Sequence, residues 1–347
     1  FIWDLPLLNI AMMSRIPRSF ARGGGIIASG VHSFTVLNST FVGNKAMLTG
    51  GGALWSDSHN LSLINSKFIN NSANHQGGAI CYHHYHYGRR RRKQKYIVLI
   101  GCSLKNNRAK WGGGIALHGF YKVYMLSTIF QYNIASDSKT SSGAAVHIRE
   151  ERTTPIILVS IASYFLHNSA IIGGALYTFY VHSFIIINSI FFKNAATDED
   201  GACSIKRANK IHFIHSAIVS NNAQMQSSAS FTSLPFMGIN TVAINNCFIS
   251  NNTARDGGAM RIINFGEIYI SSAKFLYNHA VHMGGAVQIF YSKPDEYSPY
   301  KLTKEIFILA VGNYFSRNTA KQEGNFKLLN QADRERDKQK MDRQTDK

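Results

Sequence analysis

A two-part motif recurs about ten times along this chain of 347 residues, and it constrains the fold more than any other feature. The first part reads F-x-x-N-x-A, and the second, a few residues later, reads G-G-A followed by an aliphatic residue. The pair is plainest at 41–46 with 51–54 and returns at 275–280 with 284–287. A repeat of roughly 27 residues indicates a solenoid, in which each repeat buries its apolar face against its neighbours.

Apolar residues stand at fixed distances before each Phe. Phe34 and Val36 lie seven and five residues before Phe41, and most other copies match them. Spacing by two is typical of a strand with one face turned inward. Short strands, tight corners and no helical stretch predict an all-β, single-domain, right-handed parallel β-helix of about ten coils. The copy at Phe248 is irregular, because Thr241 stands at the first of these positions.

The Asn of each copy is expected to form a structural ladder. Asn tolerates left-handed backbone, and identical Asn residues one coil apart can hydrogen-bond to each other. Ala follows two residues later in every copy but one, which has Thr253. The predicted ladder comprises Asn44, Asn71, Asn107, Asn133, Asn168, Asn194, Asn221, Asn251, Asn278 and Asn318.

Three regions follow from the extent of the repeat. The β-helix is expected over 23–326, after an N-terminal flank or partial first coil at 1–22 in which no signal peptide is visible. Residues 327–347 are dominated by charged and polar residues and predict a disordered tail. No apolar run reaches the roughly 18 residues of a membrane-spanning helix.

The formal net charge is +18, with a sequence pI near 9.8, which favours polyanionic partners. Three long insertions interrupt the repeat at the same corner of the coil, and the first is the most unusual. Its interleaved histidines, tyrosines and arginines make it a candidate polyanion-binding loop. The candidate residues are His83, His84, His86, Arg89, Arg90, Arg91, Arg92, Lys93 and Lys95. The alternative is a solvated basic loop without a ligand.

No metal ligands or cofactor are expected. His83, His84 and His86 have a loose spacing for a metal site. The four cysteines show no C-x-x-C pair and predict small apolar coil positions. Asn60 and Asn70 are candidate N-glycosylation sites, whereas the sequons at Asn38 and Asn251 are expected to be occluded.

The pairing of G-G-A-[ILV] with F-x-x-N over about 23–326 resembles the β-helix passenger domains of the chlamydial polymorphic outer-membrane proteins, in the pectin-lyase-like superfamily. Similar repeats occur in uncharacterised eukaryotic proteins, so the organism stays open. The resemblance implies a secreted β-helix at the cell surface that acts as an adhesin.

The resulting hypothesis is a non-enzymatic, extracellular or surface-exposed adhesion scaffold. Its expected partner is an anionic glycan or a cell-surface receptor, with no specific nucleic acid. The alternative is a carbohydrate-active hydrolase or lyase on acidic polysaccharide. A hydrolase needs two carboxylates up to about 9.5 Å apart, and the best pair is Glu199 with Asp256, two coils or roughly 10 Å apart. Both also fit ordinary turn positions. A third reading is a folded repeat with no selected activity.

Overall fold

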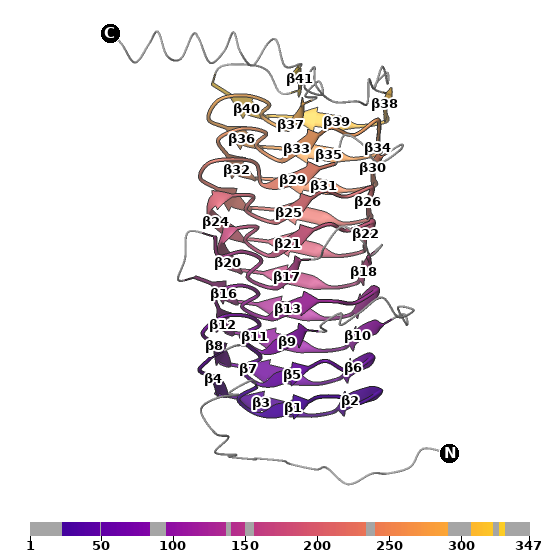
Figure 1. Cartoon of the computed structure of the whole chain (residues 1–347). Coiled ribbons are helices and arrows are strands. Elements are labelled where there is room, and N and C mark those ends of the chain that lie inside the picture. The colour runs from indigo at the N-terminus through magenta and orange to yellow at the C-terminus, as the bar shows by residue number, and fades with distance from the viewer. Residues whose placement is uncertain are drawn as a thin grey trace, which may run out of the picture.

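The computed structural model describes residues 23–48, 50–83, 95–136, 140–149, 156–233, 240–290, 307–321 and the backbone of 326–329. Within these ranges the regular structure consists of strands, which wind into a rod of stacked coils (Figure 1). Each coil adds one strand to each of four parallel sheets. The predicted all-β parallel β-helix of about ten coils is therefore confirmed.

Sheet 1 follows the Gly-Gly corners. Its strands are β1 (Ile26–Ala28), β5 (Leu54–Ser56), β9 (Ile80–His83), β13 (Ile115–His118), β17 (Val146–Arg149), β21 (Leu176–Phe179), β25 (Cys203–Lys206), β29 (Ala229–Thr232), β33 (Met260–Ile263), β37 (Val287–Phe290) and β41 (Phe326–Leu329).

Sheet 2 carries the alternating apolar residues that precede each Phe. Its strands are β2 (Ser33–Leu37), β6 (Asn60–Ile64), β10 (Tyr96–Ile100), β14 (Lys122–Leu126), β18 (Ile157–Ile161), β22 (Ser183–Ile187), β26 (Lys210–Ile214), β30 (Thr241–Asn245), β34 (Glu267–Ser271) and β38 (Phe307–Val311).

Sheet 3 carries the Phe column. Its strands are β3 (Thr40–Val42), β7 (Lys67–Ile69), β11 (Ser103–Lys105), β15 (Ile129–Gln131), β19 (Tyr164–Leu166), β23 (Ile190–Phe192), β27 (Ala217–Val219), β31 (Phe248–Ser250), β35 (Lys274–Leu276) and β39 (Tyr314–Ser316).

Sheet 4 consists of short strands that follow the Asn bend. They are β4 (Lys45–Ala46), β8 (Ser72–Ala73), β12 (Arg108–Ala109), β16 (Ile134–Ala135), β20 (Ser169–Ile172), β24 (Ala195–Glu199), β28 (Asn222–Ala223), β32 (Thr253–Ala254), β36 (His279–Ala280) and β40 (Thr319–Ala320).

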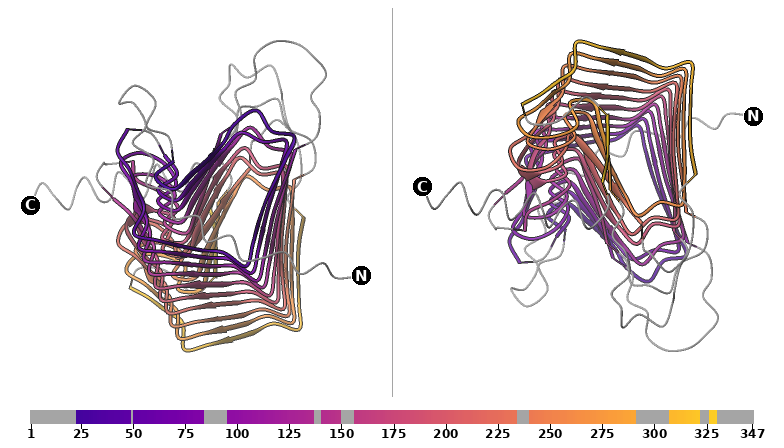
Figure 2. Two further views of the ribbon diagram at one scale, coloured as in Figure 1. Left: turned by 90° about the horizontal axis from the view of Figure 1, so that it is seen from below. Right: turned by 90° about the horizontal axis from the view of Figure 1, so that it is seen from above.

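Coil 1 is β1–β4, coil 2 is β5–β8, and the count continues to coil 10, β37–β40. Along the rod axis the coils lie one above another, so each sheet forms one wall (Figure 2). Each coil has four strands, because a short strand follows the bend at the ladder Asn. Strand β41 pairs with β37, so residues 327–329 extend the sheet past the boundary expected at 326.

The Gly-Gly corner leaves no room for a side chain. Gly77 has a φ of 60°, and a Cβ there would lie 1.9 Å from the carbonyl oxygen of Ile80. At Gly78 a Cβ would lie 2.2 Å from the carbonyl oxygen of Gly113 in the next coil. The first glycine supplies left-handed backbone, and the second permits the close approach of neighbouring coils.

The Phe column forms the centre of the core. The rings of Phe130 and Phe165 stack with centroids 5.1 Å apart, and those of Phe165 and Phe191 with centroids 4.6 Å apart. All three side chains are fully buried, together with inward aliphatic residues of sheets 1 and 2. Burial of one such side chain stabilises the fold by about 1.5–3 kcal/mol.

The Asn ladder runs beside this column. The Asn133 Nδ2 donates to Asn168 Oδ1 (3.0 Å) and to the carbonyl oxygen of Leu104 (2.9 Å). The Asn133 backbone N–H donates to the same Asn168 oxygen at 3.0 Å. This pattern links Asn44, Asn71, Asn107, Asn133, Asn168, Asn194, Asn221, Asn252, Asn278 and Asn318.

The ladder corrects the prediction in coil 8, where Asn252 replaces Asn251. Ile249, rather than Phe248, pairs with Ile218 and with Phe275 in the Phe column. Ile249 is fully buried, whereas Phe248 is 42% exposed. A shift of one residue exchanges the two faces of a strand.

This new register removes both irregularities seen in the sequence. Val242 now stands seven residues before the column residue in place of Thr241, and Ala254 stands two residues after the ladder Asn in place of Thr253. Val242 and Ala254 are both buried. Coil 8 therefore follows the same rule as the other coils.

The described ends of the long insertions share one corner of the rod. They leave after β9, β17 and β37 of sheet 1, and they return before β10, β18 and β38 of sheet 2. The insertions therefore interrupt the same connection in three different coils.

Candidate functional site

Charge is distributed unevenly along the rod. Residues 58–197 contain fifteen Lys and Arg but three acidic residues, Asp137, Glu150 and Glu151. Those three lie outside the described part, so the described portions of this stretch carry no carboxylate side chain. The described strands and turns of coils 3–5 therefore present cations without acidic side chains, and the first acidic side chains after them are Asp198 and Glu199 in β24 of coil 6.

The predicted polyanion loop is described at its two ends. His83 ends β9 and is partly exposed, whereas Lys95 precedes β10 and is 5% exposed. The Lys95 carbonyl oxygen accepts hydrogen bonds from the backbone N–H groups of Tyr121 and Lys122. Lys95 is thus a buried residue and not a surface cation, which corrects its assignment to the loop. His84, His86, Arg89, Arg90, Arg91, Arg92 and Lys93 lie outside the described residues.

His83 begins a row of stacked rings along sheet 1. It stacks on His118 with centroids 5.1 Å apart, His118 lies 5.9 Å from His147, and His147 stacks on Tyr177 at 5.1 Å. Burial, with a smaller contribution from His83, lowers the pKa of His118 to about 4. Burial also lowers the pKa of His147, and the Ser142 Oγ lies 3.0 Å from its Nδ1. His118 and His147 are therefore neutral at physiological pH and add no positive charge.

A second row crosses coils 3–6 at the bend between sheets 3 and 4. The Lys105 Nζ lies 5.9 Å from the centroid of the Tyr132 ring, which stacks on His167 at 4.9 Å. His167 meets Phe192 edge-on at 5.6 Å, and the Lys193 Nζ lies 5.1 Å from the Phe192 ring. We call these five residues the aromatic–cation strip.

Sequence reasoning missed the aromatic–cation strip. Tyr132, His167 and Lys193 each directly precede a ladder Asn, so alignment of the repeats would have placed them in one column. The contacts of Lys105 and Phe192 with that column depend on the stacking of coils and carried no signal of their own.

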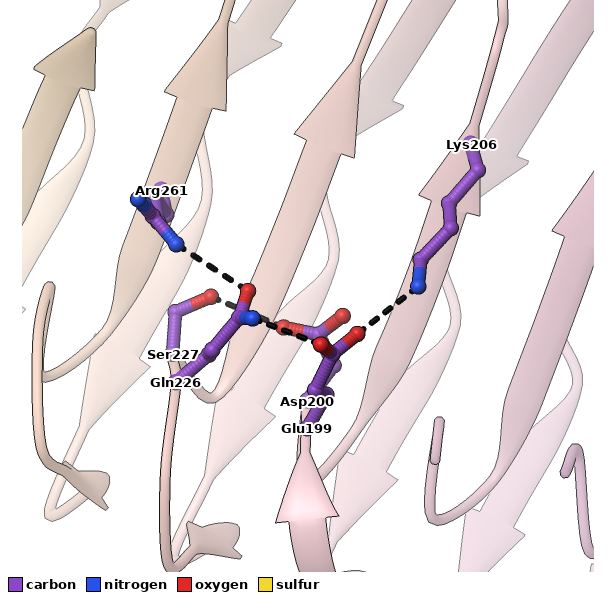
Figure 3. Close-up of polar contacts among 6 residues, drawn as sticks. All are labelled: Glu199, Asp200, Lys206, Gln226, Ser227 and Arg261. Atoms are coloured by element: carbon purple, nitrogen blue, oxygen red, sulfur yellow. Dashed lines mark hydrogen bonds and ion pairs between the residues drawn. The ribbon is translucent and has the colours of Figure 1, made fainter. Parts of the chain in front are cut away.

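Figure 3 shows a network of polar contacts across coils 6–9 beside the Gly-Gly corner. The Lys206 Nζ lies 2.7 Å from Glu199 Oε2, and the Gln226 Nε2 donates to Glu199 Oε1 at 2.7 Å. The Arg261 Nη1 donates to Gln226 Oε1 at 3.0 Å. Burial lowers the pKa of Lys206, but the hydrogen bond and charge of Glu199 outweigh burial and raise it overall. The network ties neighbouring coils together.

Asp200 lies within this network at a position that Gly occupies in most coils. Its φ is 62°, its side chain is fully buried, and its Oδ1 accepts a hydrogen bond from Ser227 Oγ at 3.0 Å. Burial raises the pKa of Asp200 to about 7, against smaller opposing effects of Ser204 and Lys206. Because it is buried, this carboxyl cannot reach a bulky substrate.

Glu199 and Asp256, the two carboxylates considered for a hydrolase, each have their own polar partners. Glu199 is held by Lys206 and Gln226, and Gln226 lies in the coil after the one that contains Glu199. Asp256 lies 3.7 Å from the Nδ1 of His282. The described side chains thus hold the two carboxylates in separate contacts rather than across an open site.

The remaining sequence candidates are surface or core positions. The sequon residues Asn38 and Asn251 are exposed, which corrects their expected occlusion; Asn70 is exposed and Asn60 is half-buried. All four cysteines are buried, and none of them forms a disulfide bond. Among the residues described, no group of three or more His, Cys, Asp or Glu side chains is arranged to hold a metal ion. No helix long and apolar enough to cross a membrane was found in the same part of the chain.

These features define a parallel β-helix with an internal Asn ladder and one strongly basic half. A model of the Chlamydia polymorphic membrane protein repeat matches residues 65–82, a segment that contains one F-x-x-N and G-G-A pair. The chain thus carries this repeat, and its resemblance to the β-helix passenger domains of the chlamydial proteins is confirmed. Repeats of this type are typical of outer-membrane surface proteins. No curated protein and no solved structure matches the chain.

Proposed function

We propose that this β-helix is an extracellular, non-enzymatic recognition rod at a cell surface, and that it adheres by binding anionic glycans. The repeat supports the surface location, since it is the repeat of a polymorphic membrane protein family. The observation that carries the ligand class is the stretch 58–197, with fifteen Lys and Arg against three acidic residues. Such a one-sided surface attracts polyanions and repels cationic partners.

The distribution of the cations favours a long ligand over a small one. Four cations that are at least partly exposed lie on coils 2, 3 and 6: Lys67, Lys105, Arg108 and Lys193. Successive coils are about 4.8 Å apart, so these cations form an extended array along the rod. A polysaccharide with repeated sulfate or carboxylate groups can contact several of them at once, which raises affinity through multivalency.

The loop arginines belong to the same basic half. Residues 84–94 connect β9 to β10 in coil 3, and Arg89, Arg90, Arg91 and Arg92 supply four of its cations. In this proposal they add electrostatic attraction to the array.

N-glycosylation at the exposed Asn70 would be compatible with an extracellular location. The alternative of a carbohydrate-active enzyme has less support, because Glu199 is held by Lys206 and Gln226 while Asp256 lies beside His282.

The test is the adhesion of beads coated with the recombinant chain to cultured cells. We expect the coated beads to adhere at least several-fold more than beads coated with heat-denatured chain. Enzymatic removal of sulfated glycans from the cells should abolish most of this difference. Replacement of Arg89 through Arg92 with Ala should weaken adhesion more in low salt than in high salt, because salt screens electrostatic attraction. Equal adhesion of native and denatured coatings would overturn the proposed function.

A further inference from the structure

We infer that the aromatic–cation strip is the contact line for a sulfated polysaccharide that runs along the rod axis. The inference takes the ligand class from the proposed function, but it assigns the contact to the folded coils 3–6 rather than to the loop. The strip comprises Lys105, Tyr132, His167, Phe192 and Lys193. It continues without interruption over four successive coils.

The backbone of the strip is unfavourable for its residues. Tyr132, His167 and Lys193 have φ of 53°, 52° and 51°, in the left-handed region. Side chains other than Gly, Asn or Asp are strained in that region, because their Cβ lies too close to the following carbonyl oxygen. In other coils the same column holds Asn70, Asn106 or Asn251, which suit that backbone, so the fold itself does not require Tyr, His or Lys. Residues kept in strained backbone at a surface are a reason to look for function.

The side chains of the strip supply donors suited to sulfate. A tyrosine hydroxyl, an imidazole N–H and two ammonium groups can all donate hydrogen bonds to anionic oxygen atoms. Tyr132 is 42% exposed, and Lys193 is exposed as well. No described residue from 58 to 197 carries a carboxylate; Asp198 and Glu199 follow in β24 of coil 6, where Glu199 is held by Lys206 and Gln226.

The spacing of the strip suits a polymer. Lys105 and Lys193 lie three coils apart, which corresponds to about 14 Å along the axis. A sugar unit has a length comparable to the rise of one coil, so a linear chain can place successive anionic groups beside successive coils. The rings of Tyr132, His167 and Phe192 lie between the two lysines, so the five side chains form one continuous surface.

The chain offers an unusually well-matched control for the test. Tyr277 and Arg317 occupy the same column in coils 9 and 10, and the Arg317 guanidinium lies 5.3 Å from the Tyr277 ring. The test variant is Tyr132→Asn with Lys193→Asn, and the control is Tyr277→Asn with Arg317→Asn. Each variant removes one tyrosine and one positive charge and introduces the residue that this column holds in other coils. Both should fold with melting temperatures at or above that of the parent.

The measurement is the dissociation constant for a heparin oligosaccharide in physiological salt, with a single-stranded DNA oligonucleotide of equal charge as a second probe. We expect the Tyr132/Lys193 variant to bind heparin at least tenfold more weakly and the control variant to change less than twofold. Equal losses in the two variants would show that net charge alone matters and would overturn the inference. No loss in either variant would overturn it too, as would DNA binding that is as tight and as sensitive to the Tyr132/Lys193 change.

Failure of the inference and failure of the proposed function give different results. If coated beads adhere to cells through sulfated glycans but the Tyr132/Lys193 variant binds heparin as the parent does, the function stands and the strip is excluded. If the beads do not adhere and the chain binds no heparin, both proposals fail.

Discussion

At the scale of single residues, the coil depends on side chains that hydrogen-bond one coil away. Besides the Asn ladder, a second column of small polar residues precedes sheet 3. The backbone N–H of Ser163 donates to Ser189 Oγ at 3.1 Å, and that of Ser189 donates to Ser216 Oγ at 3.2 Å. Cys102 and Cys247 occupy the same column, and each thiol donates to a backbone carbonyl oxygen. These residues satisfy backbone groups that would otherwise be buried without partners.

Asp200 is a buried residue whose carboxyl group makes the stability of the fold depend on pH. Its pKa is raised from 3.8 to about 7, so the folded protein keeps a proton that the unfolded chain releases above about pH 4. The free energy of unfolding should therefore fall as the pH rises from about 4 to about 7. Above about pH 7 Asp200 should cause little further change. For a shift of this size the loss is of the order of a few kcal/mol.

Asp200→Gly should remove this dependence, because Gly suits the φ of 62° and carries no buried carboxyl. Urea denaturation at pH 5 and pH 8 is the measurement. We expect the variant to be more stable than the parent at pH 8, with a smaller difference between the two pH values. Asp198→Asn, at a half-buried neighbour, serves as the control and should keep most of the parent's pH dependence. An unchanged dependence in Asp200→Gly would contradict the assignment.

At the scale of strands, the elements are too short to set their own register. Strand β31 has three residues and β32 has two, so local preference cannot decide which residue faces inward. The adjacent pairs Phe248–Ile249 and Asn251–Asn252 let two registers satisfy the motif. Pairing with β27 and β35 selects the register that buries Ile249 and leaves Phe248 outside.

Two alanine substitutions in β31 test this register. Ile249→Ala should destabilise the fold by about 2–5 kcal/mol, because it opens a cavity in the core. Phe248→Ala, which removes the larger side chain, should cost less than about 1 kcal/mol because Phe248 lies largely at the surface. Thermal unfolding followed by circular dichroism distinguishes them. The reverse order of effects would restore the register in which Phe248 and Asn251 face inward.

At the scale of the whole rod, each coil contacts its two neighbours, so stability depends on position along the stack. Phe165 in coil 5 is fully buried, whereas Phe315 in coil 10 is 38% exposed although both belong to the Phe column. A terminal coil buries less apolar surface, and it opens at a lower free energy than a central one.

Hydrogen–deuterium exchange measures this gradient. Amides of β18–β20 in coil 5 should exchange most slowly, at rates set by global unfolding. Amides of β38–β40 in coil 10 should exchange at least tenfold faster. Equal protection of the two coils would show that the rod unfolds as one cooperative unit or that another part of the chain covers coil 10.

The sequence alone determined the repeating fold, since Gly-Gly corners, Asn bends and period-two apolar residues each have a local physical cause. It predicted nine ladder positions where the structure places them, and it failed at Asn251 because the choice between two adjacent Asn residues depends on neighbouring coils. Lys95 looked like part of an exposed basic loop for a similar reason, since its burial depends on the strands around it. Only tertiary structure brought Lys105, Tyr132, His167, Phe192 and Lys193 into one line, because stacking places residues about 26–35 positions apart side by side. The repeat thus defines the rod, and the stacking of coils decides which exposed residues share a surface.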